Sequence, residues 1–150
     1  MKSVMNFGAR LLFERPARRK DFDQLADMLQ TNGEAIVGRI KSSGKGDRAR
    51  EALVHLIGIE RWGQRRLMVA LGEPFIRDEY DGYRPDDVDE WRGLRDAFEA
   101  TRGHTVELAA ALADAEFDDT IEHNAFGELT PRGWLKYLDF HANATAYLVR

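Results

Sequence analysis

Two histidines and one glutamate are the residues of this sequence whose types and spacing suit chemistry. His55 and Glu60 lie five residues apart in one stretch, and His141 lies near the C-terminus. Neutral imidazole is a ligand for Zn, Ni, Cu and Fe, and a nearby carboxylate completes or orients such a site or acts as a general base. The three residues are therefore a candidate metal or acid–base site, provided that the fold brings them together.

The stretch that carries His55 and Glu60 is the clearest predicted helix, residues 47–72. At 100° per residue its apolar side chains fall on one side and its arginines on the other. Glu60 falls near the middle of the apolar arc, and His55 falls at its edge. Because a carboxylate inside an apolar arc is costly without a partner, this placement indicates that the helix does more than pack.

Three further amphipathic helices are predicted. The first of these covers residues 21–41. The next is capped by Asp86 or Asp87 and runs to about residue 115, and the last covers residues 131–150. Apolar residues alternate at spacings of three and four in the third helix, the pattern of an antiparallel bundle seam. Thr130 and Pro131 are typical of a helix start, so they mark where the fourth helix begins.

The remaining segments are connections. Residues 1–18 are compatible with a short helix or an extended segment, ended by Pro16. The short link at residues 42–47 predicts an antiparallel pair of helices, whereas residues 75–87 and 117–129 are long connections with no convincing strand. The sequence therefore predicts an all-α four-helix bundle in a single domain, residues 1–150.

Composition excludes several functional classes. The net charge of −4 gives no general attraction to nucleic acid or to an anionic membrane, and no apolar run approaches the roughly 20 residues of a membrane span. Cysteine is absent, which excludes disulfides and thiolate ligands and agrees with a cytoplasmic location. Arg10 interrupts the apolar start of the chain, so we do not expect a signal peptide. Phosphate-binding loops, serine-hydrolase elbows and zinc-protease motifs do not occur.

The residues alone leave two interpretations of the histidines open. His141 falls at a core position of the fourth helix, on a stripe with Trp134, Leu138 and Leu148. Bundles build metal sites from facing helices, so inward histidines on two helices form a candidate half-site. An inward histidine is, however, more often satisfied by hydrogen bonds than by a metal. His123, in a loop, is predicted to make a structural contact with the backbone.

Two stretches resemble a known family. VHLIGIERW (54–62) and HNAFGELTPRGWLKYLDFHANA (123–144) are similar to the second helix and the final histidine helix of DinB/YfiT-like four-helix-bundle proteins. The resemblance implies a DinB-like bundle with a long crossover between helices two and three, assembled as a homodimer. It implies a divalent metal, Zn or Ni, held by one histidine of helix two and an H-x-x-x-H pair of helix four. Characterised relatives are thiol-dependent transferases or isomerases.

Carried over residue by residue, the resemblance gives an incomplete site. His55 matches the helix-two ligand and His141 the first histidine of the pair, but the second falls on Thr145, whose hydroxyl is a poor zinc ligand. One expectation is a weakened metal site with a low-molecular-weight thiol cosubstrate and Glu60 as base, in a transferase or hydrolase. The other is a bundle that has lost the metal and binds a small ligand or is a structural dimer.

Overall fold

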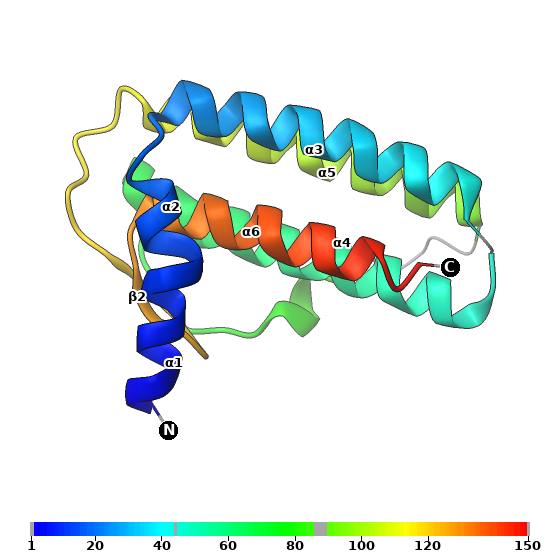
Figure 1. The fold of residues 1–150 in the computed structure, drawn as a ribbon, viewed down its shortest axis with the longest axis horizontal. Coiled ribbons are helices and arrows are strands. Elements are labelled where there is room, and N and C mark those ends of the chain that lie inside the picture. Colours follow the sequence, from blue (N-terminus) through cyan, green and yellow to red (C-terminus); the bar gives the residue numbers. More distant parts are fainter. Residues whose placement is uncertain (1, 44, 86–89, 150) are drawn as a thin grey trace.

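Four long helices form the body of the protein in the computed structural model, which describes residues 2–43, 45–85 and 90–149. They are α3 (Phe22–Ser42), α4 (Asp47–Leu67), α5 (Trp91–Leu112) and α6 (Pro131–Ala146). The predicted all-α bundle is confirmed (Figure 1). None of the described helices has the length and apolar character needed to cross a membrane.

The helices are not arranged in simple up-and-down order. α3 and α6 run in one direction and α4 and α5 in the other (Figure 1). α3 and α4 each pack against both α5 and α6, so each helix has one parallel and one antiparallel neighbour. α3 and α4 are antiparallel, as predicted. Because α4 and α5 are parallel, the chain between them returns along the bundle through the short helices η2 (Met68–Leu71) and η3 (Tyr80–Tyr83).

Side chains cap the starts of α3 and α6. Asp21 and Gln24 form a reciprocal capping box at the start of α3. Thr130 accepts a hydrogen bond from the Gly133 backbone amide at 3.1 Å, which confirms the predicted cap of α6. The predicted cap at Asp86 or Asp87 lies outside the described residues; α5 begins at Trp91, later than expected.

The N-terminal residues form helix rather than an extended segment. α1 (Lys2–Ala9), the π-helical turn η1 (Arg10–Glu14) and α2 (Arg15–Ala17) follow one another, and Pro16 does not end the run because a proline is tolerated in the first turn of a helix. The buried carboxylate of Glu14 accepts hydrogen bonds from the amide and the hydroxyl of Thr130, at 2.8 and 2.9 Å. A carboxylate is favourable at a helix N-terminus, so this contact anchors the segment to α6.

A small hairpin replaces part of a predicted loop. β1 (Ile121–His123) pairs antiparallel with β2 (Gly127–Leu129), with Ile121 opposite Leu129. Three-residue strands are too short to show a periodic pattern, and these are held by tertiary contacts. Ile121 and Leu129 are buried, and the indole of Trp134 donates to the Ile121 carbonyl at 3.0 Å. The hairpin thereby closes one end of the bundle beside α6.

Candidate functional site

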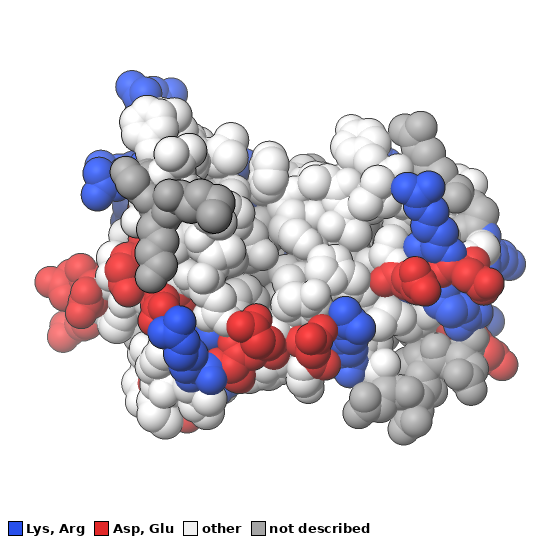
Figure 2. Space-filling model, turned by 90° about the horizontal axis from the view of Figure 1, so that it is seen from below, with Lys and Arg blue, Asp and Glu red and all other residues white. Residues whose placement is uncertain are grey.

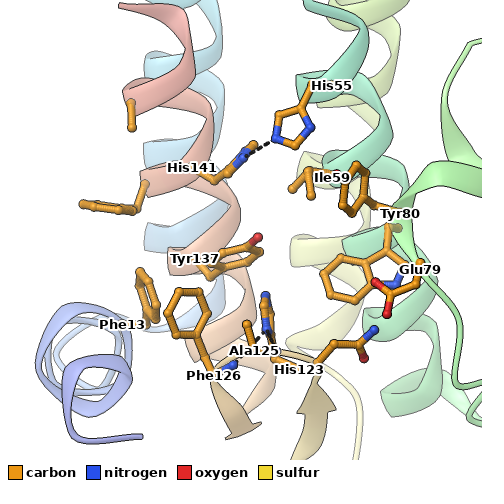
Figure 3. Close-up of a pocket in the computed structure, with 14 residues that line it drawn as sticks. Phe13, His55, Ile59, Glu79, Tyr80, His123, Ala125, Phe126, Tyr137 and His141 are labelled. Atoms are coloured by element: carbon orange, nitrogen blue, oxygen red, sulfur yellow. Dashed lines mark hydrogen bonds between the residues drawn. The ribbon is translucent and has the colours of Figure 1, made fainter. Parts of the chain in front are cut away.

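His55 and His141 meet between α4 and α6. Their Nε2 atoms are 3.2 Å apart, and their ring centroids 5.1 Å apart (Figure 3). At this distance the Nε2–H of one ring donates a hydrogen bond to the unprotonated Nε2 of the other, so the two neutral rings share a single hydrogen bond. The structure thus brings together the two histidines that the sequence singled out.

The pair lies on the wall of a cavity of about 380 Å³. The wall is mostly aromatic and apolar, and it is contributed by η1, α4, the α4–α5 connection, the hairpin and α6 (Figure 3). Its lining residues are Phe13, His55, Ile59, Trp62, Glu79, Tyr80, His123, Asn124, Ala125, Phe126, Tyr137, Phe140, His141 and Ala144. Figure 2 shows the face of the bundle below α4 and α6, where uncharged side chains surround a hollow and charged ones gather mainly along the edges.

Burial keeps the imidazoles of His55 and His141 and the phenol of Tyr137 neutral at pH 7. It lowers the pKa of His141 to about 4, helped by the nearby His55. Burial also lowers the pKa of His55, with a further contribution from the positive charge of Arg84. The pKa of the Tyr137 hydroxyl is raised, again mainly by burial. The cavity therefore presents imidazole and phenol groups without their charges.

A buried arginine holds the far wall in place. The guanidinium of Arg66 donates to the carbonyl of Ile76, to the carbonyl of Asp78 at 3.2 Å and to the side-chain oxygen of Asn124 at 3.1 Å. It also lies over the ring of Trp62, 5.0 Å from its centroid. One side chain of α4 therefore joins the α4–α5 connection to the hairpin, and both contribute to the cavity.

His123 makes the backbone contact that was predicted for it. Its Nδ1 accepts from the amides of Ala125 and Phe126, at 3.0 and 3.1 Å, so the proton of the neutral ring lies on Nε2. Nε2 is buried without a conventional hydrogen-bond partner among the described residues, and the ring packs edge-on against Tyr137 with centroids 4.5 Å apart. Although it lines the cavity, His123 primarily shapes the hairpin turn.

We expect His123 to make the protein less stable in mild acid. Burial, with the charge of Arg66, lowers its folded-state pKa from 6.5 to about 3. Between pH 6.5 and about pH 3 the unfolded chain binds more protons than the folded protein does. The free energy of unfolding therefore falls as the pH falls, by about 2 kcal/mol at pH 5 for one such group. Urea unfolding at pH 7 and pH 5 measures this loss. His123→Asn keeps an acceptor for the turn, and its stability should fall by about 2 kcal/mol less between pH 7 and pH 5 than that of the wild type. An equal fall in both proteins would contradict the lowered pKa of His123.

Glu60 does not line the cavity. Its carboxylate is buried and accepts from Arg102 of α5 at 2.7 and 3.1 Å and from the Thr105 hydroxyl at 2.8 Å. The expected placing of Glu60 beside the two histidines is thus corrected. The apolar arc was identified correctly, but the partner of the carboxylate is an arginine of another helix.

Thr145 leaves the expected metal ligand set incomplete. It follows His141 by one turn of α6, is 7% exposed and is not among the residues that line the cavity. Nowhere in the described part of the chain do three or more His, Asp or Glu side chains gather as a metal site would require. In addition, Nδ1 of His141 is buried without a partner, whereas a ligating histidine usually donates its second N–H. The residues present do not fit a resident metal with three protein ligands.

Sequence reasoning missed most of the aromatic wall. Phe13 comes from a segment whose structure the sequence left open, and Phe126 from the unpredicted hairpin. Tyr80 lies in a connection without a periodic pattern. The HNAFG stretch was the one local signal for this wall, because a turn directly before a helix places its side chains close to that helix.

Comparison with known proteins agrees with this architecture. No curated protein and no solved structure matches the chain significantly. The sequence profile of the DinB superfamily matches residues 6–143, which include both histidines, the hairpin, α3, α4, α5 and most of α6. This match covers nearly the whole chain, and the chain belongs to the DinB superfamily.

Proposed function

We propose that this protein binds a small organic molecule in the cavity between α4 and α6. The observation that supports the proposal is the cavity itself, about 380 Å³, with an aromatic wall interrupted by a few converging polar groups. Ligand sites commonly have this size and composition. The His55–His141 pair lies in this wall, where it would orient a bound molecule. Superfamily membership supports the scaffold and leaves the ligand open.

Filling the cavity should weaken ligand binding at least tenfold. Ala144 lies exposed on the cavity wall, so Ala144→Trp should occupy space that a ligand would use. We expect titration with ethylbenzene, followed by NMR, to show saturable binding to the wild type and at least tenfold weaker binding to the variant. Ala111→Trp, at an exposed position of α5, is the matched control and should bind as the wild type does. Failure of the wild type to bind small aromatic molecules would refute the proposal.

A second candidate is weak binding of a divalent metal by the two histidines alone. Two nitrogens at 2.0–2.1 Å from a tetrahedral zinc are about 3.3 Å apart. The Nε2 atoms of His55 and His141 are 3.2 Å apart, which agrees with that separation. A low-molecular-weight thiol would then add a third donor that the chain lacks. Glu60 has no part in either proposal because Arg102 and Thr105 occupy its carboxylate.

We also propose that the chain forms a homodimer through apolar residues around its N-terminal helix. Phe7 is 65% exposed and Leu11 44%, and both lie on the outer side of α1 and η1. Exposed apolar patches of this kind mark interaction surfaces. Light scattering should show a dimer for the wild type and a monomer for Phe7→Asp. Leu71→Asp, at an equally apolar but separate exposed position, should remain dimeric; a monomeric wild type would contradict the proposal.

A further inference from the structure

The hydroxyl of Tyr137 is a polar group of the cavity that has no partner within the described residues. The residue is only 6% exposed, and its ring is held edge-on by His123, Phe13 and Trp134, with centroids 4.5, 5.5 and 5.7 Å away. In Figure 3 the hydroxyl points into the space between α6 and α4, below the histidine pair. Because the ring is clamped, the hydroxyl stays at the cavity, where it is accessible to a bound molecule and can donate a hydrogen bond to it.

The lining of the cavity offers an anion no cationic side chain to pair with. Glu79 is the one charged side chain among its lining residues, and it is exposed on the wall. Lysine and arginine are absent from that lining. A carboxylate or phosphate inside would therefore lose its hydration without gaining an ion pair, which is unfavourable.

A cation is disfavoured for a different reason. Aromatic walls attract cations, but two of these rings already carry one. The guanidinium of Arg66 lies 5.0 Å from the ring centroid of Trp62, and that of Arg84 lies 5.4 Å from the ring centroid of Tyr80. These arginines are paired with Asp78 and Asp81 and already occupy the two rings, so Trp62 and Tyr80 have little further attraction to offer a bound cation. The ligand that suits this wall is consequently uncharged.

The remaining wall suits an apolar body. Phe13 and Phe126 lie beside and below the Tyr137 ring, and Ile59 lies on the side of its hydroxyl (Figure 3). An apolar cavity of about 150 Å³ holds benzene. The volume of about 380 Å³ here has room for a substituted aromatic molecule or one of similar size.

From these observations, and resting on the proposed ligand-binding function, we infer that the ligand is an uncharged molecule with an apolar body and a carbonyl-type acceptor that accepts from the Tyr137 hydroxyl. The acceptor lies toward the histidine pair, and the body lies toward Phe13 and Phe126. Tyr137 thus selects between molecules of the same shape according to whether they carry an acceptor at that position.

A pair of matched probes tests this inference. Acetophenone and ethylbenzene have the same skeleton and differ in the carbonyl oxygen. Wild-type protein should bind acetophenone more tightly by a factor on the order of ten, since one hydrogen bond to a buried group contributes roughly that ratio. In Tyr137→Phe the ratio of the two affinities should fall to about one. Tyr147→Phe, at an exposed tyrosine after α6, should keep the wild-type ratio.

Each other outcome has a definite meaning. Equal affinities for the two probes in the wild type, or a preference that persists in Tyr137→Phe, would overturn the role of the hydroxyl while leaving the cavity as a binding site. Tighter binding of benzoate or benzylammonium than of acetophenone would overturn the uncharged class. If neither acetophenone nor ethylbenzene binds, the proposed function fails, and the inference fails with it.

Discussion

Replacing Arg102 by methionine is expected to lower the free energy of unfolding by about 3–5 kcal/mol, because it leaves buried carboxylates without their cation. The guanidinium binds both oxygens of Glu60 and lies 3.5 Å from Asp139, and all three side chains are less than 5% exposed. It also donates to the Leu29 carbonyl at 3.2 Å. One side chain therefore neutralises acids from two helices and satisfies the backbone of a third.

Urea unfolding at pH 7 measures this effect. A domain of this size has about 5–15 kcal/mol of stability in total, so Arg102→Lys is a useful second variant. Lysine keeps the charge but loses the bidentate contact with Glu60, so Arg102→Lys should lower the stability less than Arg102→Met does. Arg77→Met removes an ion pair with Glu122 in which the arginine is 69% exposed, and it should cost less than about 1 kcal/mol. A loss as small as this in Arg102→Met would contradict the structure of the network.

A glycine makes the Arg102 contact possible. A Cβ at position 33 of α3 would lie 2.6 Å from Cγ of Arg102, so only glycine lets the arginine pass between α3 and α5. The ion network then connects all four long helices, since Asn32 of α3 donates to both oxygens of Asp139 at 3.0 Å. The polar layer lies between the two apolar clusters of the core. Its residues fix how the helices align.

Placing a histidine at position 145 is expected to create a strong site for a divalent metal. Thr145→His places a third imidazole one turn after His141 on α6, on the same side of the helix. Saturating zinc or nickel should then raise the melting temperature by several degrees or more, since a ligand at a thousand times its Kd stabilises by about 4 kcal/mol. The wild type, with two imidazoles, should show only a small rise.

Two controls make the metal experiment decisive. Asn143→His adds a histidine on another side of α6 and should behave as the wild type does. His55→Ala in the Thr145→His protein should abolish the gain, and metal analysis of the purified proteins should follow the same order. A low-molecular-weight thiol should increase the small effect in the wild type if it supplies a third donor. An equally large rise in wild type and Thr145→His would show that the native site is already complete.

The helices and the histidine pair could be predicted from the sequence because they follow from local spacing. Apolar periodicity gave the four long helices, and Thr130 with Pro131 gave the start of α6. The angular positions of His55 and His141 gave two inward-facing rings. A helical register determines which side of each helix is buried, and antiparallel packing of α4 on α6 brings the two rings together.

Only the tertiary structure decided what Glu60 contacts and what surrounds the histidines. Glu60 and His55 belong to one helix, yet one meets Arg102 in the core and the other meets the cavity. The cavity also needs Phe13 and Phe126, which come from opposite parts of the chain. Local sequence determines that a polar side chain is buried, but its partner depends on the order and rotation of the helices around it, and these result from packing of the whole chain.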